Sequence, residues 1–288
     1  MTNEVHLDYH AIDAVSASRL EDFLMSPRLY QALYVDKTVK PGPPTDKLEL
    51  GIGCHAWLLE PDKFEQLVAL VPNEVLGKGG RRNTKAYREF AAQHQGKALL
   101  KLDDSPHHGS MGWQTVKNIR RAVMAHPIAE TLIRCATSFE EPFFWECLWT
   151  GLSCKAKPDL ETSYKGRKLI VDLKTTGNSE HRAFVGNLMR YGYHRQAEFY
   201  RRAMQHKHRN HNKRLADFVF VVVSTVPPHV VRVYSLPDEV LNLATDQITA
   251  GMERLAACYK TGDWSEPNEN EICELQLPKW AWEEARND

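Results

Sequence analysis

Before Ser138, most of the chain repeats its apolar residues at intervals of three and four, the spacing of amphipathic helices. Ser18 stands three positions before Glu21 in the pattern of a helix capping box, and Ser26-Pro27 marks a second helix start. Further helices are predicted over residues 48–59, after a cap at Asn83 or Thr84, and over residues 105–125 and 127–135. Residues 1–137 are therefore expected to be mainly helical.

From residue 138 onward the apolar runs become short and rich in aromatic and β-branched residues. Three strands are predicted, joined by turns at Thr150-Gly151 and Lys165-Gly166, over residues 139–149, 152–162 and 168–176. Two helices, two strands and a long helix follow, over residues 179–189, 194–208, 217–225, 229–236 and 237–260. This order favours a single α/β domain over residues 1–288, with its core at 138–260 and an acidic tail at 261–288.

Composition limits the class of protein. With 42% hydrophobic and 26% charged residues, the 288-residue chain resembles an ordinary globular protein. It contains no apolar run near the ~20 residues that span a bilayer, and its first residues do not form a signal sequence, so a cytoplasmic location without membrane contact is expected. The six cysteines form no C-x-x-C pair, which argues against a zinc ribbon, and there is no P-loop for ATP.

The formal net charge is zero, but the charges are unevenly distributed. Residues 78–88 hold five basic residues and no acid, and residues 195–214 hold seven basic residues against the single acid Glu198. The negative charge of the acidic tail, residues 261–288, offsets the positive charge of both clusters. A neutral total can therefore conceal a basic groove, although either cluster alone is also typical of a solvated helix face.

Two acids and a lysine occur in neighbouring predicted strands. Alternation places Lys155, Lys157 and Asp159 on one face of the first strand, and Asp172 and Lys174 on one face of the second. If these strands pair, the carboxylates converge beside Lys174, which suits a divalent cation with oxygen ligands. The alternative is an exposed surface ion pair. The apolar run around Asp172 argues against that alternative, because a charge inside a buried strand needs a partner.

These residues resemble a known nuclease family. "KPD" followed by "DLK" matches the PD-(D/E)-x-K signature, "GIGCH" looks like the G-x-x-x-H element of its RecB-like exonuclease branch, and "QAEFY" looks like its Q-x-x-x-Y element. From Val15 to Tyr200 the chain is most similar to the C-terminal nuclease domain of RecE-type exodeoxyribonuclease VIII and its prophage relatives. The resemblance implies a restriction-endonuclease-like core with a central mixed sheet flanked by helices.

The resemblance also implies roles for individual residues. Asp159, Asp172, His55 and the carbonyl of Leu173 would be ligands of Mg²⁺, which Mn²⁺ can replace. Lys174 would orient or deprotonate the attacking water. Taken alone, His55 on an apolar helix also fits a hydrogen-bonded core residue.

Three further positions are less closely defined. Glu141 matches a glutamate that the family often carries near the metals, although the adjacent Glu140 leaves this choice open. Gln196 and Tyr200 share one helix face and would either contact DNA near the cleaved phosphate or anchor the helix. DNA phosphates would be contacted by the basic residues Lys78, Arg81, Arg82, Arg195, Arg201 and Arg202.

The resulting hypothesis is a Mg²⁺-dependent exonuclease for double-stranded DNA. The family implies 5′ to 3′ polarity, 3′ single-stranded overhangs for a RecT-like annealing protein in recombination, and a ring-shaped homo-oligomer such as a tetramer. Two alternatives remain: a structure-specific or restriction-type endonuclease on the same fold, and a catalytically silent DNA-binding module. The complete set Asp159, Asp172 and Lys174 argues against the silent module.

Overall fold

The structure is a computed structural model, which describes residue 9 and residues 11–40, 42–102, 111–208 and 216–276. It begins with helices α1 (Ala17–Met25) and α2 (Pro27–Tyr30), the latter continuing into a π-helical turn, Gln31–Val35. The capping-box prediction is wrong. Ser16 caps α1 by accepting a hydrogen bond from the Arg19 amide at 3.2 Å, while Ser18 lies inside the helix.

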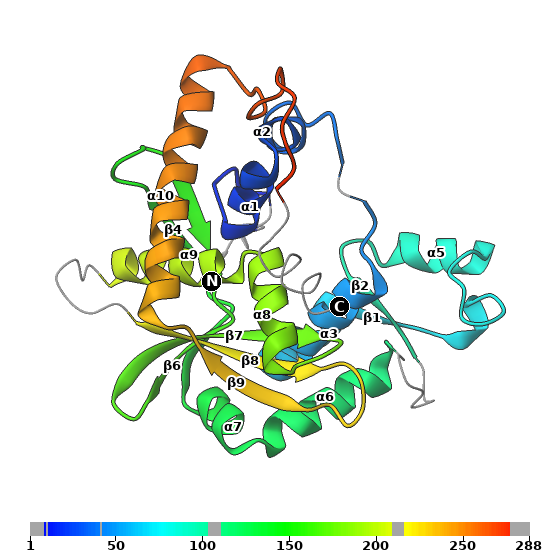
Figure 1. Cartoon of the computed structure of the whole chain (residues 1–288). Helices are drawn as coiled ribbons and strands as arrows, with labels where there is room; N and C mark the ends of the chain where they lie inside the picture. Colours follow the sequence, from blue (N-terminus) through cyan, green and yellow to red (C-terminus); the bar gives the residue numbers. More distant parts are fainter. Residues whose placement is uncertain (1–8, 10, 41, 103–110, 209–215, 277–288) are drawn as a thin grey trace, which may run out of the picture.

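Helix α3 (Asp46–Leu59) begins at the cap Thr45 and ends before a 3₁₀ turn (Pro61–Lys63) and the short helix α4 (Phe64–Leu67). Two parallel strands, β1 (Val68–Val71) and β2 (Ala98–Lys101), then flank a 3₁₀ turn (Asn73–Val75) and helix α5 (Lys85–Gln93). These strands were not predicted, because apolar runs of three or four residues carry no measurable periodicity. In Figure 1 this unit projects from the side of the molecule.

Helices α6 (Trp113–Ala125) and α7 (Pro127–Arg134) lead into the central sheet. Of the predicted helix over residues 105–125, positions 105–110 lie outside the described residues. The five strands of the sheet stand in the order β3-β6-β7-β8-β9: β3 (Ala136–Phe139), β6 (Leu160–Tyr164), β7 (Arg167–Thr176), β8 (Asp217–Ser224) and β9 (Val231–Ser235). β7 and β8 are parallel and the other neighbours antiparallel, so the sheet is mixed as expected.

The first two predicted strands are each divided. β4 (Phe143–Glu146) separates from β3, and β5 (Ser153–Ala156) separates from β6, so that β4 and β5 form a hairpin outside the central sheet. The second break contains Pro158, which cannot donate an amide hydrogen bond to a neighbouring strand. Asp159 consequently lies in a bend rather than on the strand with Lys155.

Helices α8 (His181–Arg190), α9 (Tyr193–Lys207) and α10 (Asp238–Thr261) complete the fold. Alternation along β7 divides the core: Val171 and Leu173 pack with α3, α6 and α7, while Ile170 packs with α8 and α9 on the opposite face. Figure 1 shows the sheet between these helices. None of the helices within the described ranges is long and apolar enough to cross a membrane.

The first part of the acidic tail closes over the N-terminal helices. Trp264 is buried and stacks on Tyr30, with ring centroids 5.8 Å apart. Glu269 accepts hydrogen bonds from the Arg28 guanidinium at 2.8 and 3.1 Å. Residues 277–288 of the predicted tail lie outside the described residues.

Candidate metal centre and active site

Strand β7 carries three of the predicted site residues in sequence: Asp172, Leu173 and Lys174. It lies between β6 and β8, and its interior is apolar, so its side chains are held between two helix layers. Asp172 is only 1% exposed. A charge this deeply buried requires compensating partners. These are Gln196 on α9 and Lys174 on β7.

Asp172, Lys174 and Gln196 form a closed polar network. The Lys174 ammonium lies 2.7 Å from Asp172 Oδ2 and donates a hydrogen bond to Gln196 Oε1 at 3.0 Å. The Gln196 amide donates to Asp172 Oδ1 at 3.1 Å. Lys174 and Gln196 therefore hold the two oxygens of the buried Asp172 carboxylate between them.

Asp159 is fixed to β7 from the bend before β6. Its Oδ2 accepts a hydrogen bond from the Leu173 amide at 2.6 Å, and Asp159 is 7% exposed. Lys155, predicted to share its face, lies elsewhere: its ammonium donates to the carbonyls of Tyr9 and Ile12 at 2.8 and 2.7 Å. Asp159 directly precedes β6, whose register pairs Leu160 with Val171 of β7, so Asp159 and Asp172 lie at neighbouring positions of the two strands as the predicted pairing required.

His55 reaches the same place from α3. Its Nε2 donates a hydrogen bond to the Leu173 carbonyl at 3.0 Å, and its Nδ1 lies 3.2 Å from Glu140 Oε1 and 3.5 Å from Asp159 Oδ1. His55, Glu140 and Asp159 each offer one ligand atom, and these atoms lie within 4.8 Å of one another. Three donors from α3, the end of β3 and the β5–β6 bend thus meet beside β7.

Of the two adjacent glutamates, the structure places Glu140 in this cluster. Its side chain is 8% exposed, and Oε2 lies 2.8 Å from the Lys157 ammonium. A positive φ of 47° at Glu140 turns the chain inward directly after β3. Glu141 points away, is 53% exposed, and pairs with Lys207 at 2.8 Å. Two identical side chains in a row gave no sequence signal that could separate them.

The electrostatics of the cluster reflect three acids close together. Burial opposes protonation of His55, but the carboxylates of Asp159, Glu140 and Asp172 outweigh it and raise its pKa to about 9. Burial and the neighbouring carboxylates raise the pKa of Asp159 to about 7. Burial opposes the charge on Lys174, but Asp172 and Asp159 raise its pKa above the usual value. The carboxylates therefore favour positive charge on both His55 and Lys174.

The donor set fits a divalent metal ion. Hard divalent cations prefer carboxylate and carbonyl oxygens, which Asp159, Glu140 and Leu173 provide. The imidazole of His55 adds a nitrogen ligand that is more typical of transition metals. Added positive charge would favour the ionised form of Asp159, whose pKa burial and the neighbouring carboxylates raise.

Tyr200, four residues after Gln196 on α9, lies beside this cluster: its hydroxyl hydrogen-bonds with the Gln196 side chain and is close enough to feel the charge of Asp172. Its ring packs in the core with Phe218, at a centroid distance of 6.4 Å. Burial raises the pKa of its hydroxyl well above the ordinary value. Gln196 contacts Asp172 and Lys174 directly, and Tyr200 lies next to Gln196 with its ring in the core, so the predicted pair stays together at the site.

The arginines of α9 do not form the predicted DNA surface. Arg195 makes two hydrogen bonds with the carboxylate of Glu21, at 2.6 and 2.5 Å. Arg201 and Arg202 both pair with the buried Glu198, at 2.6 and 3.2 Å. All three side chains are 18% exposed or less. The spacing of Glu198, three and four positions before these arginines, was the sequence signal for pairing within the helix.

The loop after β1 contains both paired and exposed basic residues. Arg82 lies 2.5 Å from the buried carboxylate of Glu49 and donates to the Leu99 carbonyl at 2.8 Å, so it joins the loop to α3. Lys78 and Arg81 are exposed and form no ion pair with any described residue. The predicted DNA-contacting set is thereby reduced to Lys78 and Arg81.

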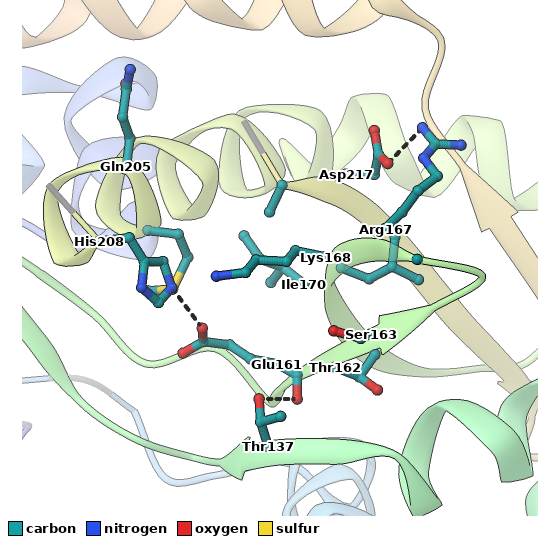
Figure 2. Close-up of a pocket in the computed structure, with 14 residues that line it drawn as sticks. Thr137, Glu161, Thr162, Ser163, Arg167, Lys168, Ile170, Gln205, His208 and Asp217 are labelled. Atoms are coloured by element: carbon teal, nitrogen blue, oxygen red, sulfur yellow. Dashed lines mark hydrogen bonds and ion pairs between the residues drawn. The ribbon is translucent and has the colours of Figure 1, made fainter. Parts of the chain in front are cut away.

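A separate pocket of about 450 Å³ lies at the other end of β7, under the C-terminal end of α9 (Figure 2). Its walls include Lys168, Glu161 and His208, with Glu161 and His208 3.3 Å apart. Lys168 precedes Asp172 by four residues, or about 13 Å along a strand. None of the residues of the metal-ligand cluster lines it. This pocket and the metal-ligand cluster are therefore separate features of β7.

A mixed sheet between helix layers, with Pro158-Asp159 and Asp172-x-Lys174 meeting at its centre, defines the PD-(D/E)-x-K nuclease fold. Residues 16–276 match the PDDEXK-like domain of unknown function (DUF3799), and the chain belongs to this family. The predicted fold class and the predicted resemblance to PD-(D/E)-x-K nucleases are confirmed.

The fold of the chain is similar to that of solved structures. A crystal structure described as a "putative exonuclease" from Eubacterium rectale is similar over 98% of this chain and 97% of its own, with 14% identity and a TM-score of 0.57, which supports the fold alone. The structure of SSO0001 covers 39% of this chain and 50% of its own at 15% identity, and its TM-score of 0.25 supports no argument. No curated protein matches the chain.

Proposed function

We propose that this protein is a Mg²⁺-dependent exonuclease that degrades one strand of double-stranded DNA from an end, with 5′ to 3′ polarity. The family and the fold support a nuclease. The observation that carries the proposal is the meeting of His55, Glu140 and Asp159 within 4.8 Å beside the Asp172–Lys174 pair. These side chains come from four separate elements, and burying so many charges together has a cost that a structural role does not explain.

Different residues of the site would bind the metal ion and stabilise the charge on the phosphate. His55, Glu140, Asp159, Asp172 and the Leu173 carbonyl would hold Mg²⁺ or Mn²⁺. When bound, the cation supplies positive charge to the phosphate and acidity to water. His55 must lose its proton before it can act as a ligand, so metal affinity is expected to fall at low pH.

Lys174 acts chiefly as a positive charge. Its raised pKa keeps the ammonium protonated, so it stabilises negative charge that develops on the phosphate and orients the water, rather than removing a proton. Gln196 fixes this ammonium through its side-chain oxygen and fixes Asp172 through its amide. This geometry favours one of the two roles that sequence analysis left open for Lys174.

DNA association would use the exposed Lys78 and Arg81, which lie on the projecting β1–β2 unit (Figure 1). Phosphate contacts carry no sequence information and suit an enzyme that tracks along a duplex. The RecE-like resemblance supports three further parts of the proposal: 3′ overhangs as product, a RecT-like annealing partner in recombination, and a ring-shaped homo-oligomer. Light scattering at working concentration tests the oligomer, which a monomer would refute.

The test of the proposed function is digestion of linear duplexes labelled at the 5′ or the 3′ end, with Mg²⁺ present or withheld. Metal-dependent release of the 5′ label before the 3′ label is expected. Covalently closed circular DNA should stay intact, whereas its cleavage would identify an endonuclease. Asp172→Asn should abolish digestion, with Asp217→Asn, at the start of β8, as the control that retains it. Equal digestion by both variants would contradict the assigned site.

A further inference from the structure

A row of aromatic rings leads from Lys174 to the protein surface. The Lys174 ammonium lies 4.6 Å from the centroid of the Tyr193 ring, and Tyr193 lies 5.6 Å from Tyr191, centroid to centroid. The Arg190 guanidinium lies 5.5 Å from the Tyr191 ring centroid. Tyr191 is therefore within about 10 Å of the reactive lysine, or about three base steps along one DNA strand.

The two tyrosines differ in their burial and in their packing contacts. Tyr193 is partly buried and contacts Phe184 and Phe220, at 6.1 Å in each case, so it is part of the core beneath α8. Tyr191 is 51% exposed, and the described contacts of its ring are with Tyr193 and Arg190. Arg190 is also exposed and forms no ion pair with the described residues. Packing thus explains Tyr193 but leaves the exposed ring of Tyr191 without a structural role.

The turn that carries Tyr191 is firmly held. Gly192 follows it with a φ of 64°, and a Cβ at Gly192 would lie 2.2 Å from the Glu21 carboxyl group. Glu21 in turn makes the two hydrogen bonds with Arg195 on α9. The turn between α8 and α9 is therefore clamped against α1, and the ring of Tyr191 is presented from a rigid support rather than from a loose loop.

We propose that Tyr191 and Arg190 form a nucleobase-stacking subsite that holds a base near the cleaved phosphate. Every base has a π-face, so such a subsite binds any sequence, while Arg190 adds a cation for the adjoining phosphate. An enzyme that degrades one strand of a duplex must separate the terminal base from its partner, and a fixed aromatic ring stabilises the separated base. This inference rests on the proposed function.

The test measures stacking without cleavage. Duplexes with the fluorescent base 2-aminopurine at the terminal or the penultimate position are titrated with the full-length protein in the absence of divalent cations. Stacking on Tyr191 should quench the fluorescence. Tyr191→Phe should retain the quenching, whereas Tyr191→Ala should lose it and weaken binding to duplex ends roughly 5- to 100-fold.

Trp149 provides a matched control, because it is 49% exposed with the Arg202 guanidinium 5.3 Å from its ring, on the β4–β5 hairpin. Trp149→Ala should leave the quenching unchanged. Full quenching by Tyr191→Ala, or equal losses in Tyr191→Ala and Trp149→Ala, would overturn the subsite. Cleavage with Mg²⁺ is measured separately: quenching without cleavage would refute only the nuclease, and cleavage without quenching would refute only the subsite.

Discussion

Replacing Asp159 with asparagine should stabilise the metal-free protein, although it removes a proposed metal ligand. Burial and the neighbouring carboxylates make the ionised form of Asp159 unfavourable and raise its pKa from 3.8 to about 7. Each pKa unit corresponds to about 1.4 kcal/mol, so ionising this group in the folded state costs about 4 kcal/mol. This cost already includes the attraction to His55. The asparagine introduces a buried N–H₂ group that needs acceptors, which offsets part of the gain, so we expect a net gain of about 2 kcal/mol near pH 8.

The sign of the pH dependence follows from the same shift. The folded-state pKa lies above the unfolded value, so the wild type loses stability as the pH rises from about 4 to about 7, and Asp159→Asn does not share this loss. The advantage of the variant should be small near pH 5 and full near pH 8. The asparagine oxygen can still accept the hydrogen bond from the Leu173 amide.

The assay is thermal unfolding followed by circular dichroism in a chelator, at about pH 5 and about pH 8. A gain of about 2 kcal/mol corresponds to a rise of roughly 4 °C in Tm for a chain of this size. Added Mg²⁺ should stabilise the wild type and leave Asp159→Asn unchanged, because ligand binding stabilises only a protein that binds it. A variant that melts below the wild type near pH 8, or that gains as much from Mg²⁺, would refute the reasoning.

Two further pairs of variants test the assignments that the structure changed. Glu140→Gln should lower Mg²⁺-dependent digestion at least 100-fold, as expected for loss of a metal ligand, whereas the exposed Glu141→Gln should stay within about twofold; the reverse ranking in an end-labelled digestion assay would restore Glu141 to the site. Arg82→Ala should destabilise the fold by about 3 kcal/mol in denaturant unfolding, because it leaves the buried Glu49 unpaired. Arg81→Ala should unfold like the wild type but reduce the salt dependence of DNA binding by about 0.9 log unit; equal effects of Arg81→Ala and Arg82→Ala on stability would contradict this division.

The sequence was sufficient for the fold class and for most helices. Helices α3, α7, α9 and α10 and strands β7 and β8 lie close to their predicted positions, because each is long enough for its periodicity or apolar run to identify it. Asp172 and Lys174 stood out because an acid and a lysine interrupt an apolar strand, whereas the roles of Asp159, Asp172 and Lys174 came from their match to the PD-(D/E)-x-K signature. The local sequence pattern predicts an element when that element's own residues carry the periodicity or the apolar run.

Tertiary structure decided which charged residues face the site and which are already paired. Glu140 and Glu141 are equivalent in sequence, and only the turn after β3 directs one inward and the other toward Lys207. Arg82 and Arg195 are as basic as Arg81, but acids from α3 and α1, far away in the chain, pair with both. A charged side chain is available to a ligand only if no closer partner neutralises it, and that partner is set by the packing of distant elements rather than by neighbouring residues.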